Sequence, residues 1–188
     1  MTPTLPNLPD HIETDRLLIR PHHPGDGRAL FEATVESLTD LRRWPAAMGW
    51  ALEEPSEEQS EAFCRQCAQD FAARREFPLL LTDKASGEIV GSSGLHRPDW
   101  SVPKLEIGWW VRTGRGGRGL VTEGARAIVE FGFAHLGARR IFALPDDENA
   151  ASCRVCERIG MQFEGLLRNE RAEPGGRLRN TRMYAAIR

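Results

Sequence analysis

Apolar positions along the chain follow two periods, and each period predicts a different kind of element. Residues 12–20 alternate and then become apolar, which predicts a strand that ends at Pro21. Residues 28–37 carry apolar side chains at helical spacing, and residues 24–26 precede them as a turn with a helix cap. The segment 38–50 is too apolar for a free loop and too broken for a long helix.

The clearest helix start in the sequence lies at Ser56. Gln59 follows it by three residues, the spacing of a capping box. Glutamates crowd the first turn, where the helix dipole favours negative charge. The predicted helix runs to about Arg75, and a solvated helix N-terminus accounts for its acidic run without any binding partner.

The rest of the chain predicts further strands interrupted by two helices. Apolar runs at 77–82 and 88–95 flank polar turn residues with a glycine, which is typical of a β-hairpin. The other predicted strands are 105–111, 140–144, 161–167 and 179–187, and the helices are 120–136 and 149–159. This order predicts a mixed α/β fold in one domain, without repeats or a dividing linker.

Composition and charge narrow the class of protein. The chain has 188 residues, enough for one domain and too few for two ordinary ones. A net charge of −2 gives no electrostatic basis for binding nucleic acid. No stretch approaches the apolar length of a transmembrane helix, and residues 1–10 lack the pattern of a secretory signal. We therefore expect a cytoplasmic protein without a membrane or nucleic-acid partner, its domain spanning residues 1–188 with 1–10 as a loose tail.

The four cysteines form two Cys-x-x-Cys pairs, Cys64/Cys67 and Cys153/Cys156. Both pairs fall inside predicted helices, and a zinc site would require these distant pairs to meet. We expect four reduced, partly buried thiols and no metal site.

A glycine-rich segment, residues 111–123, joins a predicted strand to a predicted helix. Glycines let a backbone approach a ligand closely and adopt positive φ. The helix start offers unpaired N–H groups and the positive end of its dipole. Three arginines also lie there: Arg112, Arg115 and Arg118. These features together predict an anion site, most naturally for a phosphate or pyrophosphate.

The same segment matches a dinucleotide fingerprint formally, because Gly114, Gly116 and Gly119 satisfy G-x-G-x-x-G. The context argues against that reading. The strands before the loop come as a hairpin and meander, and too little chain follows for a doubly wound sheet. A P-loop is excluded because no Gly-Lys-Ser/Thr follows.

Over about residues 12–187 the arrangement resembles the GNAT superfamily of acyl-CoA N-acyltransferases, most closely its RimJ/RimL-type branch, which acetylates ribosomal-protein N-termini. The segments that carry the likeness are 13–20, the tryptophan-bearing 41–50, 106–111, the loop 114–123, and 147–161 with its Asn-x-x-Ser helix start. The resemblance implies a single-domain GNAT-like α/β fold with a central, mostly antiparallel twisted sheet flanked by helices. It also implies that the chain could pair as a homodimer.

Several positions depart from the family pattern. The first position of the loop, usually Gln or Arg, is Gly114, and the usual aromatic residue after Gly160 is Met161. Cys156 stands where many members carry a catalytic tyrosine, and the one tyrosine of the chain is Tyr184. The final strand lacks the aspartate that is common there. These departures favour an alternative, a GNAT-fold acyl-CoA-binding or sensing module without turnover.

The resemblance implies acetyl-CoA as co-substrate and direct transfer of its acetyl group to a primary amine, on a protein N-terminus or a small molecule. The backbone of 109–111 would pair with the pantetheine arm, and N–H groups of 115–120 would hold the pyrophosphate. Asn149 would bind the pantetheine region, and Ser152 would protonate the departing thiolate, with Cys156 as second choice. The implied acetyl-CoA residues are Trp109, Trp110, Val111, Arg115, Gly116, Gly117, Arg118, Gly119, Leu120, Asn149 and Ser152.

The acceptor side is less defined by the sequence. An α-amino group has a pKa of ~8, so one carboxylate acting through water would suffice as its base. Glu106 and Glu170 are the candidates for this catalytic role, and Asp146, Asp147 and His96 remain open. The candidate substrate-binding residues are Trp44, Trp50 and His96, with Trp100 as a further aromatic.

Overall fold

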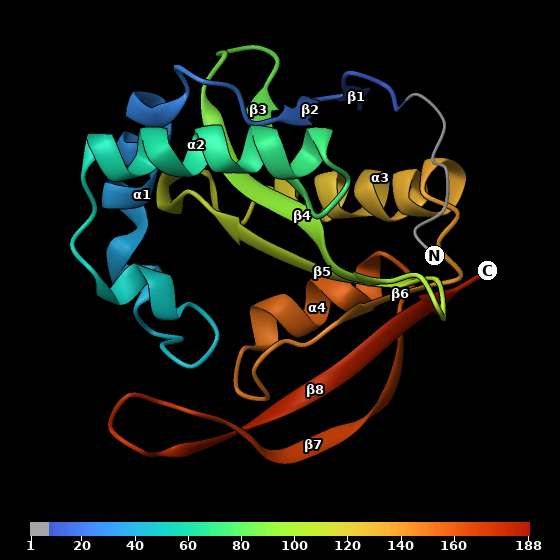
Figure 1. Ribbon diagram of the computed structural model, residues 1–188. Helices are drawn as coiled ribbons and strands as arrows, with labels where there is room; N and C mark the ends of the chain where they lie inside the picture. Colours follow the sequence, from blue (N-terminus) through green and yellow to red (C-terminus); the bar gives the residue numbers. More distant parts are fainter. Residues whose placement is uncertain (1–7) are drawn as a thin grey trace.

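The computed structural model describes residues 8–188 as an eight-stranded sheet with helices on both faces (Figure 1). The strand order is β1-β2-β3-β4-β5-β6-β8-β7, and β5–β6 is the one parallel pair among these neighbours. The strands are β1 (Ile12–Glu13), β2 (Leu17–Pro21), β3 (Phe77–Asp83), β4 (Ile89–Asp99), β5 (Lys104–Val111), β6 (Arg140–Ala143), β7 (Gln162–Ala172) and β8 (Leu178–Ile187). The predicted mixed α/β fold with a mostly antiparallel sheet is confirmed.

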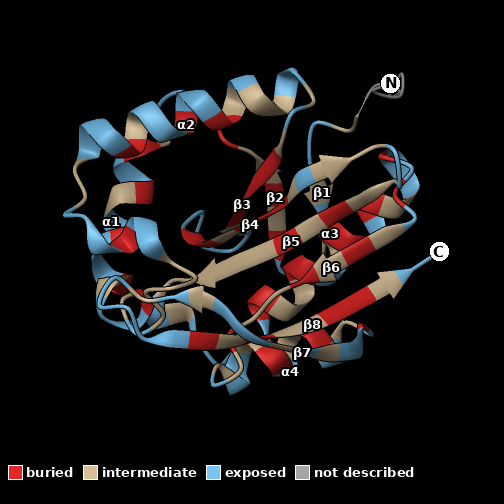
Figure 2. Cartoon of the chain, turned by 60° about the horizontal axis from the view of Figure 1, so that its bottom comes forward, coloured by how far each residue is buried: buried red, intermediate tan, exposed pale blue. Residues whose placement is uncertain are grey.

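Four α-helices and two short 3₁₀ helices complete the described chain. They are α1 (Gly27–Leu41), η1 (Gly49–Leu52), α2 (Glu57–Ala72), η2 (Thr113–Arg115), α3 (Leu120–His135) and α4 (Ala150–Arg158). The main core cluster joins α3 and α4 to one face of the sheet. A smaller cluster joins α1 and α2 to the other face, over β2, β3 and β4. Figure 2 shows the buried residues concentrated along these packed surfaces, and the outer side of α2 exposed.

Local sequence signals explain where α2 begins and why β3 is buried. Ser56 forms the predicted capping box, because its hydroxyl accepts from the Gln59 N–H and the Gln59 side chain accepts from the Ser56 N–H, both at 3.1 Å. β3 is buried on both faces over its first five residues, as its continuous apolar run indicates.

Several element boundaries differ from the sequence predictions, among them the end of β4, which reaches Asp99 rather than residue 95. The predicted strand 12–20 is split into β1 and β2, because Glu123 of α3 accepts hydrogen bonds from the Thr14 hydroxyl and the Arg16 N–H at the turn between them. α1 extends to Leu41, into the segment the sequence left unassigned. β7 continues to Ala172, since β8 supplies its hydrogen-bonding partner along that length.

The ends and the cysteines complete the comparison. Residues 1–7 of the expected N-terminal tail lie outside the described residues, and Leu8 packs against the main core. All four cysteines are free and buried, as predicted. Burial raises the pKa of Cys64, Cys67 and Cys156 to about 12, so these groups remain thiols at neutral pH.

Candidate functional site

A cavity of about 560 Å³ lies where the end of β5, the glycine-rich loop and the first turn of α4 meet. The residues after α1 close it from the opposite side, through Trp44 and Met48. Most of the predicted acetyl-CoA residues line it: Trp109, Trp110, Val111, Arg115, Gly116, Gly117, Gly119, Leu120, Asn149 and Ser152. The structure therefore brings together two predicted segments, 109–120 and 149–152, that are separate in sequence.

One wall of the cavity is the edge of β5 after it separates from β6. The two strands pair only from Lys104 to Glu106, and β5 then continues to Val111. Arg112 donates its N–H to the Val90 carbonyl at 2.9 Å, on the β4 side. Because successive peptide groups point to opposite sides of a strand, those of Val111 point toward the open side. An extended ligand could pair with this edge as an added strand.

The glycine-rich loop presents backbone N–H groups to the other end of the cavity. Gly117 and Gly119 have φ of 73° and 76°, a left-handed conformation that favours glycine. Gly119 is the N-cap of α3 and offers no capping side chain. The first intrahelical bond of α3 runs from the Glu123 N–H to the Gly119 carbonyl, which leaves the N–H groups of residues 120–122 without helical acceptors. This arrangement suits an anion such as a pyrophosphate.

The arginines of the loop hold the loop in place, a use that sequence reasoning did not foresee. Arg112 forms an ion pair with Glu36 of α1 at 2.6 Å, and Glu36 also accepts from the Gly114 N–H at 2.9 Å. Hydrogen bonds from Arg112 and Gly114 lower the pKa of Glu36. Arg115 is paired with Glu88 at the start of β4. Both contacts fix the loop against neighbouring elements before any ligand binds.

Arg118 is the predicted acetyl-CoA residue that does not line the cavity. Its side chain is exposed, and its carbonyl accepts from the Arg16 guanidinium at 2.9 Å. Two arginines that the sequence analysis passed over, Arg154 and Arg158, line the cavity instead. They lie four residues apart on α4, a spacing that places both side chains on one helix face.

The first turn of α4 brings Asn149 and Ser152 to the cavity. The Asn149 side-chain oxygen caps the helix by accepting from the Ser152 N–H at 3.1 Å. The capping role therefore belongs to Asn149, which leaves the Ser152 hydroxyl and the Asn149 side-chain N–H groups available to a ligand. Cys156 does not line the cavity, since it is fully buried in the core.

Two ion pairs anchor this helix start to the C-terminal hairpin formed by β7 and β8. Arg179 of β8 forms two hydrogen bonds with Asp146, and both side chains are only 7% exposed. Interaction with Asp146 raises the pKa of Arg179 despite its burial. Arg182 pairs with Asp147 at 2.6 Å. Asp146 and Asp147, open as bases in the sequence, are thus engaged by arginines.

The predicted acceptor residues lie mainly beside this cavity rather than in it. Trp44 lines the cavity, whereas Trp50 contacts Trp110 in a tilted arrangement with ring centroids 6.3 Å apart. Glu106 and His96 are directly opposite one another on β5 and β4. Along β5, Glu106, Gly108 and Trp110 are partly exposed on the α1/α2 face, while Leu105 and Ile107 are buried on the α3 face. Over residues 105–108 the α1/α2 face of β5 is therefore the more accessible one.

Both predicted carboxylate bases already have partners. Glu106 accepts from the Arg97 guanidinium at 2.5 Å and is only 14% exposed. Glu170, on β7, accepts from the Thr181 hydroxyl at 3.0 Å and from Arg171 at 3.1 Å. Neither residue lines the cavity, so their catalytic role stays a prediction.

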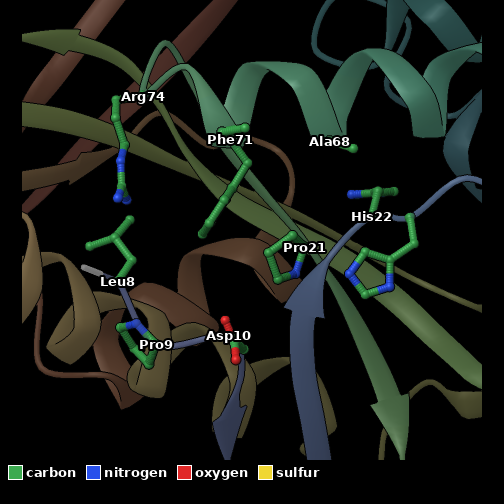
Figure 3. A pocket seen from close by; sticks show the side chains of 10 residues that line it. Leu8, Pro9, Asp10, Pro21, His22, Ala68, Phe71 and Arg74 are labelled. Carbon is green, nitrogen blue, oxygen red and sulfur yellow. The ribbon is translucent and has the colours of Figure 1, made fainter.

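A second cavity, of about 450 Å³, lies between α2 and the segment that precedes β1 (Figure 3). Phe71 and Ala68 of α2 face it from one side, Leu8 and Pro9 from the other, and His22 lies where β2 ends. His22 is fully buried, and neither ring nitrogen has a hydrogen-bond partner among the described residues. Burial lowers the pKa of His22 to about 4.

The described residues contain neither a cluster of metal-ligating side chains nor a membrane-spanning helix. Between residues 8 and 188, no group of three or more His, Cys, Asp or Glu side chains could hold a metal ion. In the same range, no helix has both the length and the apolar character needed to cross a membrane.

Comparison with known proteins adds a family and several relatives. Residues 16–162 match the model of the acetyltransferase (GNAT) domain. The chain is 32% identical over 158 residues to the uncharacterized N-acetyltransferase YnaD of Bacillus subtilis (strain 168), covering 84% of this chain and 86% of that protein.

Solved structures share the fold. The Microcin C7 self immunity acetyltransferase MccE, solved with acetyl-CoA and AMP, superposes with a TM-score of 0.82 at 19% identity and covers 96% of this chain and 97% of its own. RimL, the ribosomal L7/L12 alpha-N-protein acetyltransferase, solved with coenzyme A, gives a TM-score of 0.81 at 19% identity over 94% of this chain and 97% of its own.

Proposed function

This chain belongs to the GNAT family of acetyltransferases, and from that premise we propose that it moves the acetyl group of acetyl-CoA directly to a primary amine. The observation that carries the proposal is the continuity of the cavity. The open edge of β5 leads directly to the uncapped N-terminus of α3, so one extended ligand can contact both. The acetyl-CoA complex of MccE, which shares this fold, supports the choice of ligand.

The described residues fit each part of acetyl-CoA. The open peptide groups of Val111 suit the amides of the pantetheine arm, and Asn149 retains side-chain donors on the facing wall. The N–H groups around Gly117 and Gly119 suit the pyrophosphate. Arg154 and Arg158 add positive charge to the same cavity.

The proposed reaction forms one bond and breaks one bond. The acceptor nitrogen attacks the thioester carbonyl carbon, a C–N bond forms, and the C–S bond breaks. A backbone N–H of β5 near Trp110 stabilises the charge that develops on the carbonyl oxygen. Ser152 donates its hydroxyl proton to the leaving thiolate and recovers a proton from solvent, which its position on the cavity wall allows.

The proposed acceptor is a protein N-terminus or a small amine. The fold shared with RimL supports an N-terminal acceptor, as the RimJ/RimL-like resemblance implies. Glu106 and Glu170 stay the carboxylates predicted from the sequence as bases, although Arg97 and Arg171 already pair with them, and Trp44 and Trp50 supply apolar contact. A cytoplasmic location and pairing as a homodimer stay predictions from the sequence.

The alternative function, acyl-CoA binding without turnover, rests on one specific observation. Cys156 occupies the position of the usual catalytic tyrosine and is fully buried, and the Tyr184 hydroxyl is engaged by Glu157 at 3.2 Å. If Ser152 does not act as the acid, no tyrosine replaces it at the cavity.

The two functions are separated by acetyl transfer itself. Purified protein is incubated with acetyl-CoA and a panel of N-terminal peptides and small amines, and products are measured by mass spectrometry. We expect a mass gain of one acetyl group on at least one amine, and a fall of about 10²-fold in kcat for Ser152→Ala. The melting temperature of Ser152→Ala should not change, because Asn149 provides the cap.

A thermal-shift titration with CoA and NADH supplies the control for that experiment. Stabilisation by acetyl-CoA and CoA but not NADH, with no acetyl transfer to any amine, would support the binding module and overturn the enzyme. Stabilisation by NADH in competition with CoA would overturn both.

A further inference from the structure

A histidine–carboxylate pair lies on the accessible face of the sheet, beside the point where β5 separates from β6. His96 Nδ1 and Glu76 Oε2 are 2.8 Å apart. His96 is the register partner of Glu106, and Glu106 is the last residue of β5 that pairs with β6. His96 is therefore on the strand next to β5, at the register where the open edge begins and the donor arm is expected to bind, and Glu76 lies on the far side of His96 beside β3.

The contacts of Glu76 determine which nitrogen of His96 carries the proton. Burial alone would raise the pKa of Glu76, but the hydrogen bonds from His96 and from the Arg97 N–H (3.0 Å) outweigh it and leave the pKa below its usual value. An ionised carboxylate only accepts hydrogen bonds, so Nδ1 must donate to it. In neutral His96 the free lone pair is then on Nε2.

The Nε2 atom lies over Gly94, next to an open position of the sheet at Gly108. A Cβ added to Gly94 would lie 2.9 Å from His96 Nε2, which places the ring directly over this glycine. Gly108, the register partner of Gly94, has open space where a side chain would stand. None of the described residues hydrogen-bonds Nε2. A Cβ at Gly94 would also lie 2.7 Å from the Phe77 carbonyl oxygen, so the room for a substrate group near this nitrogen is the open space at Gly108.

Arg97, the residue after His96, has an unfavourable backbone conformation that its hydrogen bonds stabilise. Arg97 has a φ of 51°, in the left-handed region that is unfavourable for a non-glycine residue. This conformation turns its N–H toward Glu76 Oε1, while its guanidinium reaches Glu106. Backbone strain of this kind concentrates at functional sites. The same contacts orient the Glu76 carboxylate and pair the Glu106 carboxylate with the Arg97 guanidinium.

We propose that His96 is the catalytic base that removes the proton from the acceptor amine, with Glu76 as its positioning residue; this inference rests on the function proposed above. His96 Nε2 takes one proton from the acceptor ammonium and becomes the imidazolium. The neutral amine then attacks the thioester carbonyl carbon, the C–S bond breaks, and the nitrogen loses its second proton to solvent. Ser152 protonates the leaving thiolate as described above, and the imidazolium returns its proton to solvent. No oxidant, reductant or further reactant is needed.

His96 is a better base here than the two carboxylates predicted from the sequence. The charged groups that face it are Glu76 beside β3, Arg97 on β4 and Glu106 on β5. Glu106 is neutralised by Arg97, whereas His96 Nε2 has no partner. A carboxylate partner on Nδ1 also stabilises the imidazolium that forms.

Kinetics against pH test the proposal with matched variants. His96→Gln should lower kcat by about 10²-fold and remove the acidic limb of the kcat/KM profile, because the titrating base is gone. Glu76→Gln should give a smaller loss and move that limb, since Nδ1 loses its charged partner. His135→Gln, which removes an exposed histidine at the end of α3, should leave the profile unchanged. Melting temperatures establish that each variant is folded.

Two kinetic outcomes would overturn the proposal. One is an acidic limb that survives in His96→Gln but disappears in Glu106→Gln or Glu170→Gln, which would make a carboxylate the base. The other is a change in acceptor KM alone for His96→Gln, which would make His96 a binding residue.

A measurement independent of turnover separates this proposal from the proposed function. Imidazole ¹⁵N NMR of the unaltered protein should show His96 as the Nδ1–H tautomer, with Nε2 taking up the proton on acidification. The Nε2–H tautomer would contradict the proposal even if acetyl transfer is robust. Absence of transfer to any amine would overturn the proposed function, and the tautomer would still decide the state of His96.

Discussion

The proposed site has a donor side, where acetyl-CoA would bind, and an acceptor side, where the amine would bind. The two sides differ in whether backbone or side chains form them. The proposed donor side consists of backbone: the open edge of β5, the glycines of the loop and the first turn of α3, contiguous over residues 109–122. The proposed acceptor side consists of side chains from separate elements, among them Trp50, Glu106 and Glu170. A backbone site tolerates many sequences, while a side-chain site changes with each substitution. One fold can therefore keep its donor and vary its acceptor.

The largest effect on stability is expected at the ion pair between Arg179 and Asp146, which joins the β7–β8 hairpin to the start of α4. Arg179→Met would leave Asp146 buried without its partner, and we expect a loss of roughly 3–5 kcal/mol in the free energy of unfolding. The matched control is Arg188→Met. It removes an exposed pair with Glu130, which should cost less than about 1 kcal/mol. Equal losses in urea denaturation would show that the Asp146 pair does not hold the hairpin.

Acidification should destabilise the protein through a residue that belongs to neither side. The pKa of His22 is about 4 in the folded protein, against about 6.5 when unfolded, so the unfolded chain binds more protons between these values. The stability is fully present above pH 6.5 and should fall by about 3 kcal/mol as pH drops to 4. Measurements that compare the donor and acceptor sides should therefore be made above about pH 6.5, where the protein keeps its full stability.

Denaturation curves measured from pH 7 to pH 4 check that expectation. His22→Leu should flatten the dependence, whereas His135→Gln should retain it. A slope that persists unchanged in His22→Leu would assign the acid sensitivity to the carboxylates.

The elements themselves could be predicted from the sequence because their signals are local. The capping box at Ser56 and the helical spacing after Leu120 need no knowledge of the rest of the chain. The turn between β1 and β2 could not be predicted, because Glu123 fixes it from 109 residues away. Boundaries set by such distant contacts are invisible in a local pattern.

The same reasoning explains how much of the site could be predicted. The glycine-rich loop is continuous in sequence, and nearly all its predicted residues line the cavity. The role of Arg112 was missed because its partner, Glu36, lies 76 residues away on α1. The pair of Glu76 and His96 has no sequence signature for a similar reason: its members are 20 residues apart and meet only through the register of β3 and β4.

Substitution of Gly119, a glycine with positive φ in the loop, should weaken the binding of acetyl-CoA on the donor side. Gly119→Val puts a β-branched residue at the left-handed N-cap of α3, where a φ of 76° is strained. We expect the resulting shift of the N–H groups to lower acetyl-CoA affinity about 10²-fold, or ~2.7 kcal/mol. Gly137→Val is the control, because Gly137 has a similar φ of 68° at the other end of α3. Both variants should lose comparable stability, and calorimetry should find weaker acetyl-CoA binding only in Gly119→Val. Equal affinity in both would remove the loop from the donor site.

The smallest effect is expected at the rim of the acceptor side. Trp50 is 49% exposed and contacts Trp110 at a tilt of 55°, so its truncation removes an aromatic contact worth about 1 kcal/mol. Trp50→Ala should therefore lower kcat/KM for the acceptor about fivefold and leave the KM for acetyl-CoA unchanged. Leu52→Ala, which truncates another exposed apolar residue of η1, should change neither value. A fall in acetyl-CoA affinity in Trp50→Ala would mean that the tryptophan supports the donor arm through Trp110, and the division into two sides would then fail at this point.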